Sequence, residues 1–458
     1  MNYIKNSAEI LSHGNIALRK TALDILNSGL ESADPGIAAR RLLRFDEAEK
    51  TLWVGERRYL LSDFEHIYVL GAGKATFPIA KALEDIVGPY ITAGIITCKQ
   101  GQEGELKHCA MRVASHPIPD EAGMSAAKEI LALAQKTQAK DLVFACITGG
   151  SSALMPLPVP EITLDDKKTA NKLLLTCGAN IIEINAVRKH LSLIKGGLLA
   201  QAIHKDALLI NLTVSDVIGD PLDYITDPTV PDTSDFSDAQ KTLDKYDLWD
   251  RMPSAISSYL KNPPRERETP KSFEGRRVEN HILVPGDAAC EGAAKRALEL
   301  GYEPMVLSTM LEGESRELGR TFGFIAREIL HSGRPLKCPC IVIGGGETTV
   351  SIGSINDAEH GSGGPNQEFA LGAALEIGDI GSVVVVGLDS DGTDGPTDLA
   401  GGVVDDQSLS RAREKGVDIF SSLKKHDATT ALQKLGDAIL TGNTGTNVND
   451  LKVMAVEK

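Results

Sequence analysis

Positive charge and aromatic side chains are scarce in this chain of 458 residues. Lys and Arg total 48 against 63 Asp and Glu, a formal net charge of −15 at pH 7, and aromatic residues make up only 4%. Nucleic acids are held by basic surfaces, and single strands also stack on aromatic rings. We therefore expect no nucleic-acid partner, although a local basic pocket still allows a small anionic substrate.

Long apolar runs and a cysteine framework are missing as well. No segment reaches about 18 consecutive apolar residues, the length that a transmembrane helix needs, and the N-terminal segment lacks the apolar core of a secretory signal. The seven cysteines are odd in number and scattered, which favours free thiols in a reducing compartment. We expect a cytoplasmic protein with no membrane partner.

Glycine, in contrast, is abundant, with 44 residues. Short apolar runs, such as those at 66–70, 141–147 and 207–214, are each followed by Gly, Ser or Thr, and amphipathic segments recur between the runs. Strands that alternate with helices are typical of parallel sheets covered on both faces. The N-terminal residues 5–45 are predicted to be helical because their apolar positions recur at helical spacing.

The pattern predicts an α/β fold with two Rossmann-like lobes, whose mostly parallel sheets are flanked by helices and whose active site lies in the interlobe cleft. The N-terminal lobe is predicted to span 1–245 and the C-terminal lobe 246–458, with the helices of 1–45 also able to pack on the other lobe. Residues 260–280 are rich in proline and charge, which predicts a linker that acts as a hinge.

The first candidate site is the strand-to-helix turn Gly71-Ala-Gly73-Lys74. Glycines allow the backbone to approach an anion, the helix N-terminus offers free N–H groups, and Lys74 adds a mobile charge. A plain turn with an exposed lysine is the alternative. The turn is a poor dinucleotide fingerprint, because the third glycine would fall at Thr76 and no acid follows the strand at 93–98.

A second candidate is the loop 148–152, which follows the apolar run at 141–147. Gly149, Gly150, Ser151 and Ser152 can form a nest of N–H and hydroxyl donors for a carboxylate or phosphate. A serine nucleophile is the competing interpretation, but no GxSxG elbow or catalytic triad can be identified. An ordinary Gly/Ser turn is equally compatible with the sequence.

A basic segment follows at 185–197. On a helix, Arg188, Ser192 and Lys195 would share one face, and such a face could bind a substrate carboxylate. A solvated cationic stripe is the more common arrangement.

Two acidic segments also follow apolar runs. Asp216 stands where α/β proteins bind ligands and could orient a hydroxyl. Asp389, Asp391 and Asp394 lie in a glycine-rich turn, whose oxygens suit Mg²⁺ bound together with substrate phosphates. Solvated aspartates in a turn are the alternative for this second segment.

Two further loops, 344–349 and 441–450, are dense in glycine, hydroxyl and amide side chains. Either loop alone is unremarkable in composition. Together with the segments above, however, at least five strand-terminal loops carry such residues, which favours a site that holds a polyphosphate.

These segments resemble one family, the glycerate 2-kinases (class II glycerate kinases), whose C-terminal lobe is called the MOFRL domain. The resemblance rests on GAGKA at 71–75, HPIPDEAG at 116–123, TGGSSALMPLP at 148–158, INAVRKHLSLIKGGLLA at 184–200, SDVIGDP at 215–221, DPTVPDTSDF at 227–236, GGGETTV at 344–350, GGPNQEFALG at 363–372, SDGTDGPTDLAGGVVD at 390–405 and TGNTGTNVNDLKV at 441–453. The segments run in family order over almost the whole chain.

The resemblance implies that ATP and a small acid bind between two lobes and that Mg²⁺ supports phosphoryl transfer. Lys74 matches the lysine that contacts the phosphoryl group, and Asp216 matches the acid near the accepting hydroxyl. Ser151, Ser152 and Arg188 match positions that face the acid. Nucleotide contacts are expected from Gly71, Gly73, Gly149, Gly150, Gly345, Glu347, Asn366, Thr444 and Asn447, and metal contacts from Asp389, Asp391 and Asp394. Pro365 departs from the family, which commonly has arginine there.

The sequence thus predicts a phosphotransferase, an ATP- and Mg²⁺-dependent kinase of the 2-hydroxyl of D-glycerate or a close hydroxy acid. An NAD(P)H-dependent hydroxypyruvate reductase, a label that some family members carry, and a non-catalytic sensor of sugar acids or phosphates are the alternatives. The exact acceptor, the phosphorylated carbon and the nucleotide preference stay open, and a homodimer is compatible with the sequence.

Overall fold

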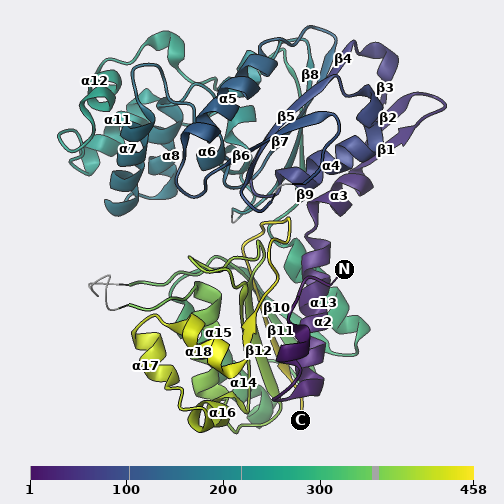
Figure 1. The fold of residues 1–458 in the computed structure, drawn as a ribbon, viewed down its shortest axis with the longest axis vertical. Helices are drawn as coiled ribbons and strands as arrows, with labels where there is room; N and C mark the ends of the chain where they lie inside the picture. Colours follow the sequence, from purple (N-terminus) through teal and green to yellow (C-terminus); the bar gives the residue numbers. More distant parts are fainter. Residues whose placement is uncertain (1, 103, 218, 353–359) are drawn as a thin grey trace. The chain divides into compact units, whose positions relative to one another are not determined.

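The computed structural model describes residues 2–102, 104–217, 219–352 and 360–458. The chain forms two compact units (Figure 1). We call residues 35–215 and 220–283 the N-terminal unit, and residues 1–34, 216–219 and 284–458 the C-terminal unit. Within the described ranges, no helix combines the length and apolar character that a membrane span requires.

The N-terminal unit contains a six-stranded sheet in the order β6-β5-β4-β7-β8-β9. The pairs β4–β5, β4–β7, β5–β6 and β7–β8 are parallel, which confirms the prediction for this sheet. Its strands are β4 (His66–Ala72), β5 (Ala93–Lys99), β6 (Cys109–Ala114), β7 (Asp141–Ile147), β8 (Leu208–Val214) and β9 (Arg277–Val284).

Helices cover both faces of this sheet. Leu70 and Ala72 of β4 share a core with Ala127 and Ile130 of α5 (Glu121–Ala134). Gly71 points to the other face, where a Cβ atom would lie 2.6 Å from Cγ2 of Thr76 in α4 (Thr76–Val87). A small antiparallel sheet of β1 (Leu43–Asp46), β2 (Thr51–Val54) and β3 (Arg57–Leu60) follows α3 (Pro35–Leu42) and was not predicted.

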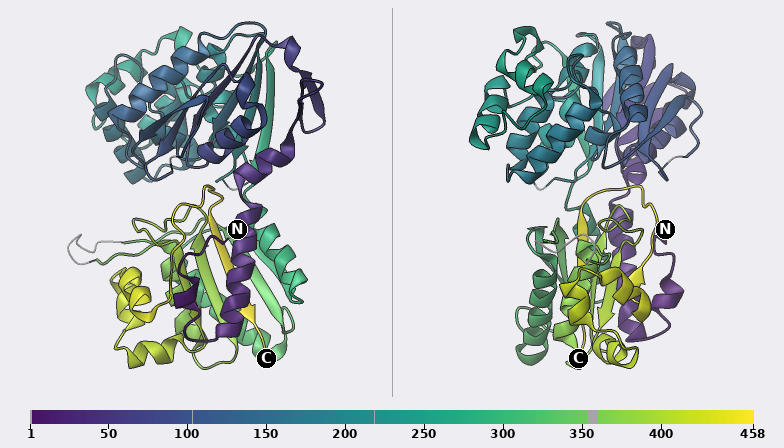
Figure 2. Two further views of the ribbon diagram at one scale, coloured as in Figure 1. Left: turned by 45° about the vertical axis from the view of Figure 1, so that its right-hand side comes forward. Right: turned by 60° about the vertical axis from the view of Figure 1, so that its left-hand side comes forward.

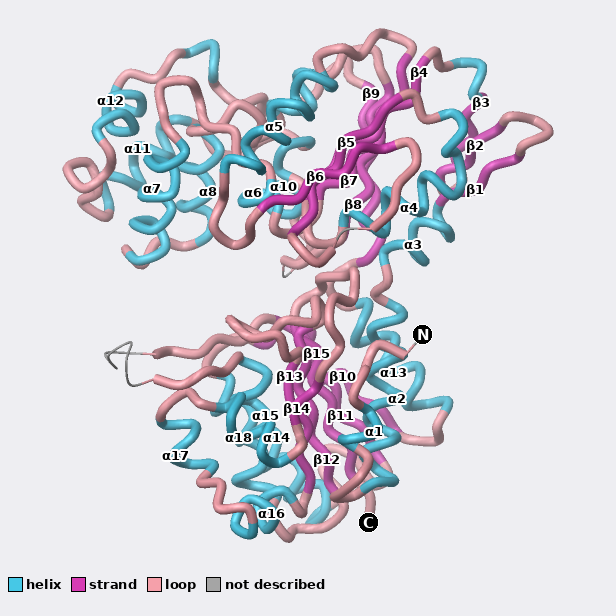
Figure 3. Tube along the Cα trace, in the orientation of Figure 1, coloured by secondary structure: helices cyan, strands magenta, loops and turns pink. Residues whose placement is uncertain are grey.

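A block of helices forms a second core in the N-terminal unit, grouped to one side of the sheet in Figures 1 and 3. Its main helices are α7 (Leu164–Thr176), α8 (Ile181–His190), α11 (Phe236–Lys245) and α12 (Ser254–Lys261). Thr163, Asn180 and Asp235 begin α7, α8 and α11 with capping boxes, which satisfy amides that the first turn leaves unbonded. Shorter helices are α6 (Ser151–Leu154), α9 (Leu198–Ala202), α10 (Leu222–Ile225), η1 (Leu61–Asp63), η2 (Gly88–Tyr90), η3 (Asp227–Thr229) and η4 (Arg265–Arg267).

Residues 260–280 do not form the predicted linker. Oγ1 of the buried Thr269 donates a hydrogen bond to Asp232 at 2.9 Å, and the carboxylate of Glu268 accepts one from the amide of Phe236 at 3.1 Å. The segment then enters β9, which adds to the N-terminal sheet. The boundary between the units therefore falls at 283–284 and not at 245–246, and the chain also crosses between units after residues 34, 215 and 219.

The C-terminal unit contains a mixed sheet in the order β10-β11-β15-β12-β13-β14. Only β10 and β11 pair in parallel; the other pairs are antiparallel. The expected α/β class is confirmed, but the mostly parallel arrangement is not seen here, because β15 inserts antiparallel between β11 and β12. The strands are β10 (Glu303–Leu311), β11 (Cys340–Gly346), β12 (Val383–Asp389), β13 (Gly401–Asp405), β14 (Ala438–Ile439) and β15 (Asp450–Val456).

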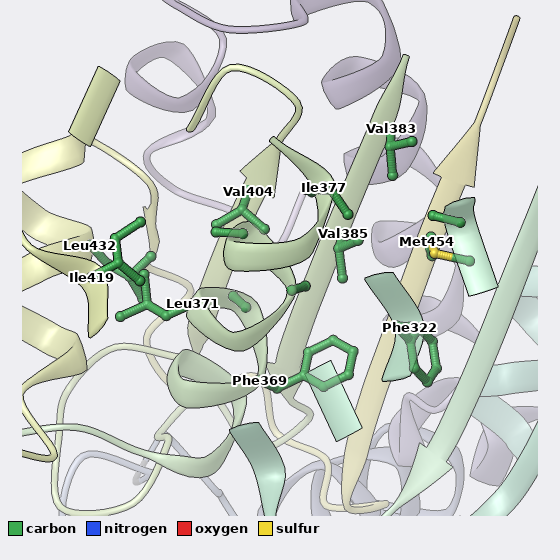
Figure 4. Close-up of a cluster of buried hydrophobic side chains, with 14 of the residues drawn as sticks. Phe322, Phe369, Leu371, Ile377, Val383, Val385, Val404, Ile419, Leu432 and Met454 are labelled. Atoms are coloured by element: carbon green, nitrogen blue, oxygen red, sulfur yellow. The ribbon is translucent and has the colours of Figure 1, made fainter. Parts of the chain in front are cut away.

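Helices also cover both faces of this mixed sheet (Figure 2). The helices α14 (Ser315–Ser332) and α15 (Pro365–Ile377) pack on one face, where Phe322 and Phe369 meet edge to face with ring centroids 5.0 Å apart (Figure 4). The helices α2 (Ile16–Ser32) and α13 (Ala288–Glu299) pack against each other and on the sheet. The remaining helices are α1 (Ser7–Ile10), α16 (Ser408–Glu414), α17 (Ile419–Lys424) and α18 (Ala428–Leu435).

Residues 1–34 thus pack in the C-terminal unit. The guanidinium of Arg19, in α2, is buried and donates to Asp405 at 2.6 Å and to Asp437 at 2.8 Å. These contacts join the N-terminal segment to β13 and to the turn before β14.

Candidate functional site

The loops after β4 and β7 dock against each other at the carboxyl edge of the N-terminal sheet. The amide of Lys74 donates to the carbonyl of Gly149 at 2.8 Å, and the amide of Ala75 donates to Oγ1 of Thr148 at 3.1 Å. The amide of Thr148 in turn donates to the carbonyl of Ala72 at 3.0 Å. Two loops that lie 75 residues apart in sequence therefore form one rigid backbone surface.

Glycine is required at position 73 by this close approach. Its φ is +144°, and a Cβ atom there would lie 2.1 Å from Oγ1 of Thr148. No side chain caps the first turn of α4 in the described structure, so the helix N-terminus can attract an anion. Lys74 is half-buried beside it.

Ser151 and Ser152 begin α6, next to this surface. Gly150 has φ +86°, and a Cβ atom there would lie 3.2 Å from both the His116 ring and Cγ of Lys74. His116 thus lies close to the loop 148–152, which is predicted to bind an anion, although His116 itself was not predicted to have a role. The signal was present, because HPIPDEAG is one of the family segments.

The basic segment is not one helix. The helix α8 ends at His190, the amide of Leu193 donates to the carbonyl of Leu157 at 2.9 Å, and Gly196 and Gly197 have φ values of +62° and +85°. These glycines and the pairing with 157–158 stop the helix, so the predicted face of Arg188, Ser192 and Lys195 does not exist.

Arg188, which is half-buried, instead belongs to a group of charges that includes the buried Lys167, Lys195 and Asp227. Its guanidinium makes one hydrogen bond within the described residues, from Nε to Oδ1 of Asn171 at 3.1 Å. The ammonium of Lys195 contacts Asp227 at 2.7 Å. Burial, together with the nearby charges of Lys195 and Arg188, lowers the pKa of the buried Lys167 to about 7. Lys167, Lys195 and Asp227 were not predicted as parts of one site.

In the C-terminal unit, three strand ends meet at one edge of the sheet. Asp450, the first residue of β15, lies opposite Gly346 at the end of β11 and opposite Asp389 at the end of β12. The loops 344–349 and 389–395 therefore flank one carboxylate. The backbone and hydroxyl of Thr348 donate to that carboxylate at 3.1 and 3.0 Å.

Asn366 is the centre of a buried polar network at this edge. Its Nδ2 donates to Asp450 at 2.6 Å and to Asp394 at 3.2 Å, and its Oδ1 accepts from Lys452 at 3.3 Å. Lys452 is fully buried and also contacts Asp450 at 2.6 Å. Because the side chain of Asn366 is occupied by protein partners, the geometry favours a structural role over the predicted nucleotide contact.

The three predicted metal ligands do not act alike. Both oxygens of Asp394 accept backbone N–H groups of α15, from Asn366 at 3.0 Å and from Gln367 at 2.9 Å, so this carboxylate caps a helix. Asp391 accepts the amide and hydroxyl of Thr393. Burial, with Asp391 and Asp450 nearby, raises the pKa of Asp389. Among the described residues, no group of three or more Asp, Glu, His or Cys side chains is arranged to hold a metal ion.

The loop 441–449 docks onto the turn after β12. The amide of Val448 donates to Oγ of Ser390 at 2.8 Å, and the hydroxyl of Thr444 donates to the carbonyl of the same serine. Nδ2 of Asn447 donates at 2.9 Å to Asp216, which follows β8 and belongs to the C-terminal unit. The structure therefore brings two predicted site residues, Asn447 and Asp216, together.

Gly345 and Glu347 lie at the end of β11 but differ in exposure. Gly345 is buried, and a Cβ atom there would lie 2.7 Å from Sγ of Cys290, so packing explains this glycine. Glu347 is exposed. The structure thus places most of the predicted residues at the loop edges of two sheets, with Arg188 in α8 and Asn366 in α15 as exceptions, while the roles assigned to them stay predictions.

Two protein-family models match the chain. The model described as "Domain of unknown function (DUF4147)" matches residues 21–261, and the model of the MOFRL family matches residues 340–450.

Full-length relatives agree with these matches. A Pyrococcus horikoshii protein named glycerate 2-kinase is 39% identical over 96% of this chain and 97% of its own length. An Agrobacterium vitis protein named provisionally as a hydroxypyruvate reductase is 35% identical over 100% and 98%. The crystal structure of a Thermotoga maritima glycerate kinase superposes with a TM-score of 0.82 at 34% identity, over 96% of this chain and 99% of that one. With a DUF4147 domain followed by a MOFRL domain, this chain belongs to the glycerate kinase family, as its sequence motifs indicated.

Proposed function

We propose that the protein transfers the γ-phosphoryl group of ATP to the 2-hydroxyl of D-glycerate, or of a close hydroxy acid, and that Mg²⁺ assists. As a member of the glycerate kinase family, the chain is a phosphotransferase with an alcohol group as acceptor. The observation that carries the finer proposal is the joined pair of loops at 71–75 and 148–152. Their backbone and Lys74 form the kind of surface that binds phosphate groups.

Phosphoryl transfer needs positioning and charge neutralisation more than covalent chemistry. In the proposed reaction, Lys74 neutralises charge on the transferring phosphoryl group. Ser151 and Ser152 offer donors beside it, and Arg188 binds the acceptor carboxylate. Asp216 orients the accepting hydroxyl, and the amide of Asn447 holds the Asp216 carboxylate.

Magnesium would be held by Asp389 and Asp391 together with ATP phosphates. Mg²⁺ commonly takes one or two carboxylates plus phosphate oxygens and water, so two aspartates fit, whereas the carboxylate of Asp394 is occupied by α15. The ion would neutralise charge on the phosphates. A carboxyl group with a raised pKa, such as that of Asp389, would also ionise more readily beside a cation.

A coupled assay of ADP release, run with Mg²⁺-ATP and a series of small hydroxy acids, tests the proposal. Phosphorus NMR of the product identifies the phosphorylated carbon. We expect turnover with D-glycerate and a signal from 2-phosphoglycerate. Absence of turnover with every acid, or phosphorylation of the 3-hydroxyl, would contradict the proposal.

A hydroxypyruvate reductase is the second candidate, because of the name of the Agrobacterium vitis relative. The site offers little support for it, since Thr76 occupies the third glycine position and its hydroxyl donates to the carbonyl of Cys146 at 2.9 Å. Fluorescence titration with NADH and NADPH separates the two functions. Tight nicotinamide binding without ATP binding would reverse the ranking.

A further inference from the structure

The N-terminal unit contains a buried excess of positive charge. Lys167 from α7, Arg188 from α8 and Lys195 from the turn after α8 share a single carboxylate, that of Asp227. Lys167 is 2% exposed and Lys195 is 4% exposed. Buried cations are normally paired, because taking an unpaired charge out of water is strongly unfavourable.

Lys189, the residue after Arg188, shows how a buried lysine is fully paired in this protein. Lys189 is also buried, and it contacts both Asp223 and Asp232, the latter at 3.0 Å. Although burial opposes it, these carboxylates raise the pKa of Lys189. Lys189 is therefore paired within the protein, which indicates a structural role.

The charges around Lys167, in contrast, are not fully paired. Within the described residues, the Lys167 ammonium has no hydrogen-bonded or ion-paired partner, and the terminal amino groups of Arg188 make no hydrogen bond. Oδ1 of Asp227 is buried and has no hydrogen-bond donor among the described residues. The group thus lacks an anion and a donor, and a hydroxy acid would supply both.

We infer that Lys167 binds the acceptor of the proposed kinase, where it and Arg188 together hold the carboxylate of a small hydroxy acid. The inference rests on the proposed function and names a residue that no sequence motif indicated. A guanidinium and an ammonium together can hold both oxygens of one carboxylate. The group around Lys167 has three cations and one carboxylate, so it can accept an anion, and the proposed acceptor supplies a carboxylate.

Lys167→Met tests the assignment, because methionine keeps much of the stem volume and removes the charge. We expect the KM for D-glycerate to rise about tenfold or more, with the KM for ATP unchanged within about twofold. Calorimetric titration with D-glycerate in the presence of Mg²⁺-ADP should show the same loss of affinity without any turnover.

Lys168→Met is the matched control. Lys168 is the next residue on α7, but its side chain is 35% exposed and pairs with Asp165 at 3.2 Å on the surface. We expect this variant to bind D-glycerate as the wild type does.

Thermal stability separates ligand binding from a structural role. Removing a buried unpaired cation should leave the thermal midpoint of the ligand-free protein unchanged or higher. A lower midpoint of Lys167→Met, with KM values for both ATP and D-glycerate raised together, would show that the lysine supports the fold and would overturn the inference.

Proton uptake gives a readout that no structural role would move. A carboxylate bound beside Lys167 favours the ammonium form of this lysine, as the carboxylate of Asp227 already does. The positive charges of Arg188 and Lys195 act in the opposite direction. Titrations of the wild type above neutral pH, in buffers of different ionisation enthalpy, should show proton uptake with D-glycerate that Lys167→Met abolishes.

The outcomes distinguish the assignment of Lys167 from the proposed function. If the wild type phosphorylates D-glycerate but Lys167→Met leaves its KM within about twofold, the assignment of Lys167 fails and the function stands. If D-glycerate binds in a Lys167-dependent way but is never phosphorylated, the function fails and the assignment of Lys167 stands. If the wild type neither binds nor phosphorylates any small hydroxy acid, both fail. Inorganic phosphate that binds more tightly than D-glycerate at this lysine would also overturn the carboxylate assignment.

Discussion

Replacing Arg19 by Met should destabilise the C-terminal unit strongly. The Arg19 guanidinium is fully buried and donates to Asp405 at 2.6 Å, to Asp437 at 2.8 Å and to the carbonyl of Ile10 at 3.1 Å. In the variant, the buried carboxylates of Asp405 and Asp437 lose Arg19 but keep Arg411, which lies 2.9 Å from each of them. Removal of one partner from a buried ion pair costs about 3–5 kcal/mol, and because Arg411 remains we expect about 3 kcal/mol.

The pKa of Asp405 gives a second route to this magnitude. Burial acts to raise the pKa of this carboxyl group. The positive charges of Arg19 and Arg411 outweigh burial and lower the pKa from its ordinary 3.8 to about 2. A shift of this size corresponds to about 2 kcal/mol of stability at neutral pH from one of the two carboxylates. Because the folded-state pKa is depressed, this stability is present above about pH 4 and is lost as the pH falls towards about 2.

Urea unfolding at pH 7 measures the loss, and hydrogen exchange of the α2 amides shows whether it is centred on that helix. Arg334→Met is the control, because Arg334 is 74% exposed and pairs with Glu328 on the surface of the same unit; we expect it to cost less than about 1 kcal/mol. The difference between Arg19→Met and wild type should narrow below pH 4. A cost below about 1 kcal/mol at pH 7 for Arg19→Met would refute the reasoning.

Two variants test the proposed role of the loop at 71–75. Lys74→Met should lower turnover about 100-fold, comparable to the loss of one preorganised donor, with little effect on folding. Lys81→Met is the control, because the side chain of Lys81, in α4, is 38% exposed and pairs with Asp85; full activity of Lys74→Met would remove Lys74 from the site. Gly73→Ala should displace Thr148 and lower both turnover and thermal stability. Gly178→Ala is its control, because Gly178 has φ +86° with nothing within 4 Å of its Cβ position; we expect only the backbone cost of about 1 kcal/mol. Equal effects of the two alanines would argue against the close packing at position 73.

Much of the N-terminal sheet could be predicted from sequence. The apolar runs at 66–70, 141–147 and 207–214 become β4, β7 and β8, because each is long enough for a strand and ends in a small-residue loop. Because β4 and β7 pair in parallel, their carboxyl ends lie side by side, which brings Gly73 and Thr148 together. The mixed character of the C-terminal sheet could not be predicted, since a strand buried on both faces has the same apolar pattern in either direction.

The charged residues mark where sequence reasoning failed. Lys167, Lys195 and Lys452 are all buried, but lysine is normally exposed. Asp227 contacts Lys195 and Asn366 contacts Lys452, and each of these partners lies in another element. Asp227 follows Lys195 by 32 residues, and Asn366 precedes Lys452 by 86. A single sequence contains no signal that identifies the partner of such a lysine. A charged residue within an apolar run, as in DLKVMAV at 450–456, was the one local sign.

The order of strands in the C-terminal sheet affects its assembly during synthesis. Until β15 has been made, β11 and β12 have no strand between them, and each presents an unpaired edge. About 100 residues separate β11 from β15, so at about 5–20 residues per second the two halves wait roughly 5–20 s for their central strand. Open edges of this kind pair readily with other chains. A nascent or truncated chain that lacks residues 450–456 should therefore depend on chaperones and aggregate, even though every loop predicted to form the site has already been made.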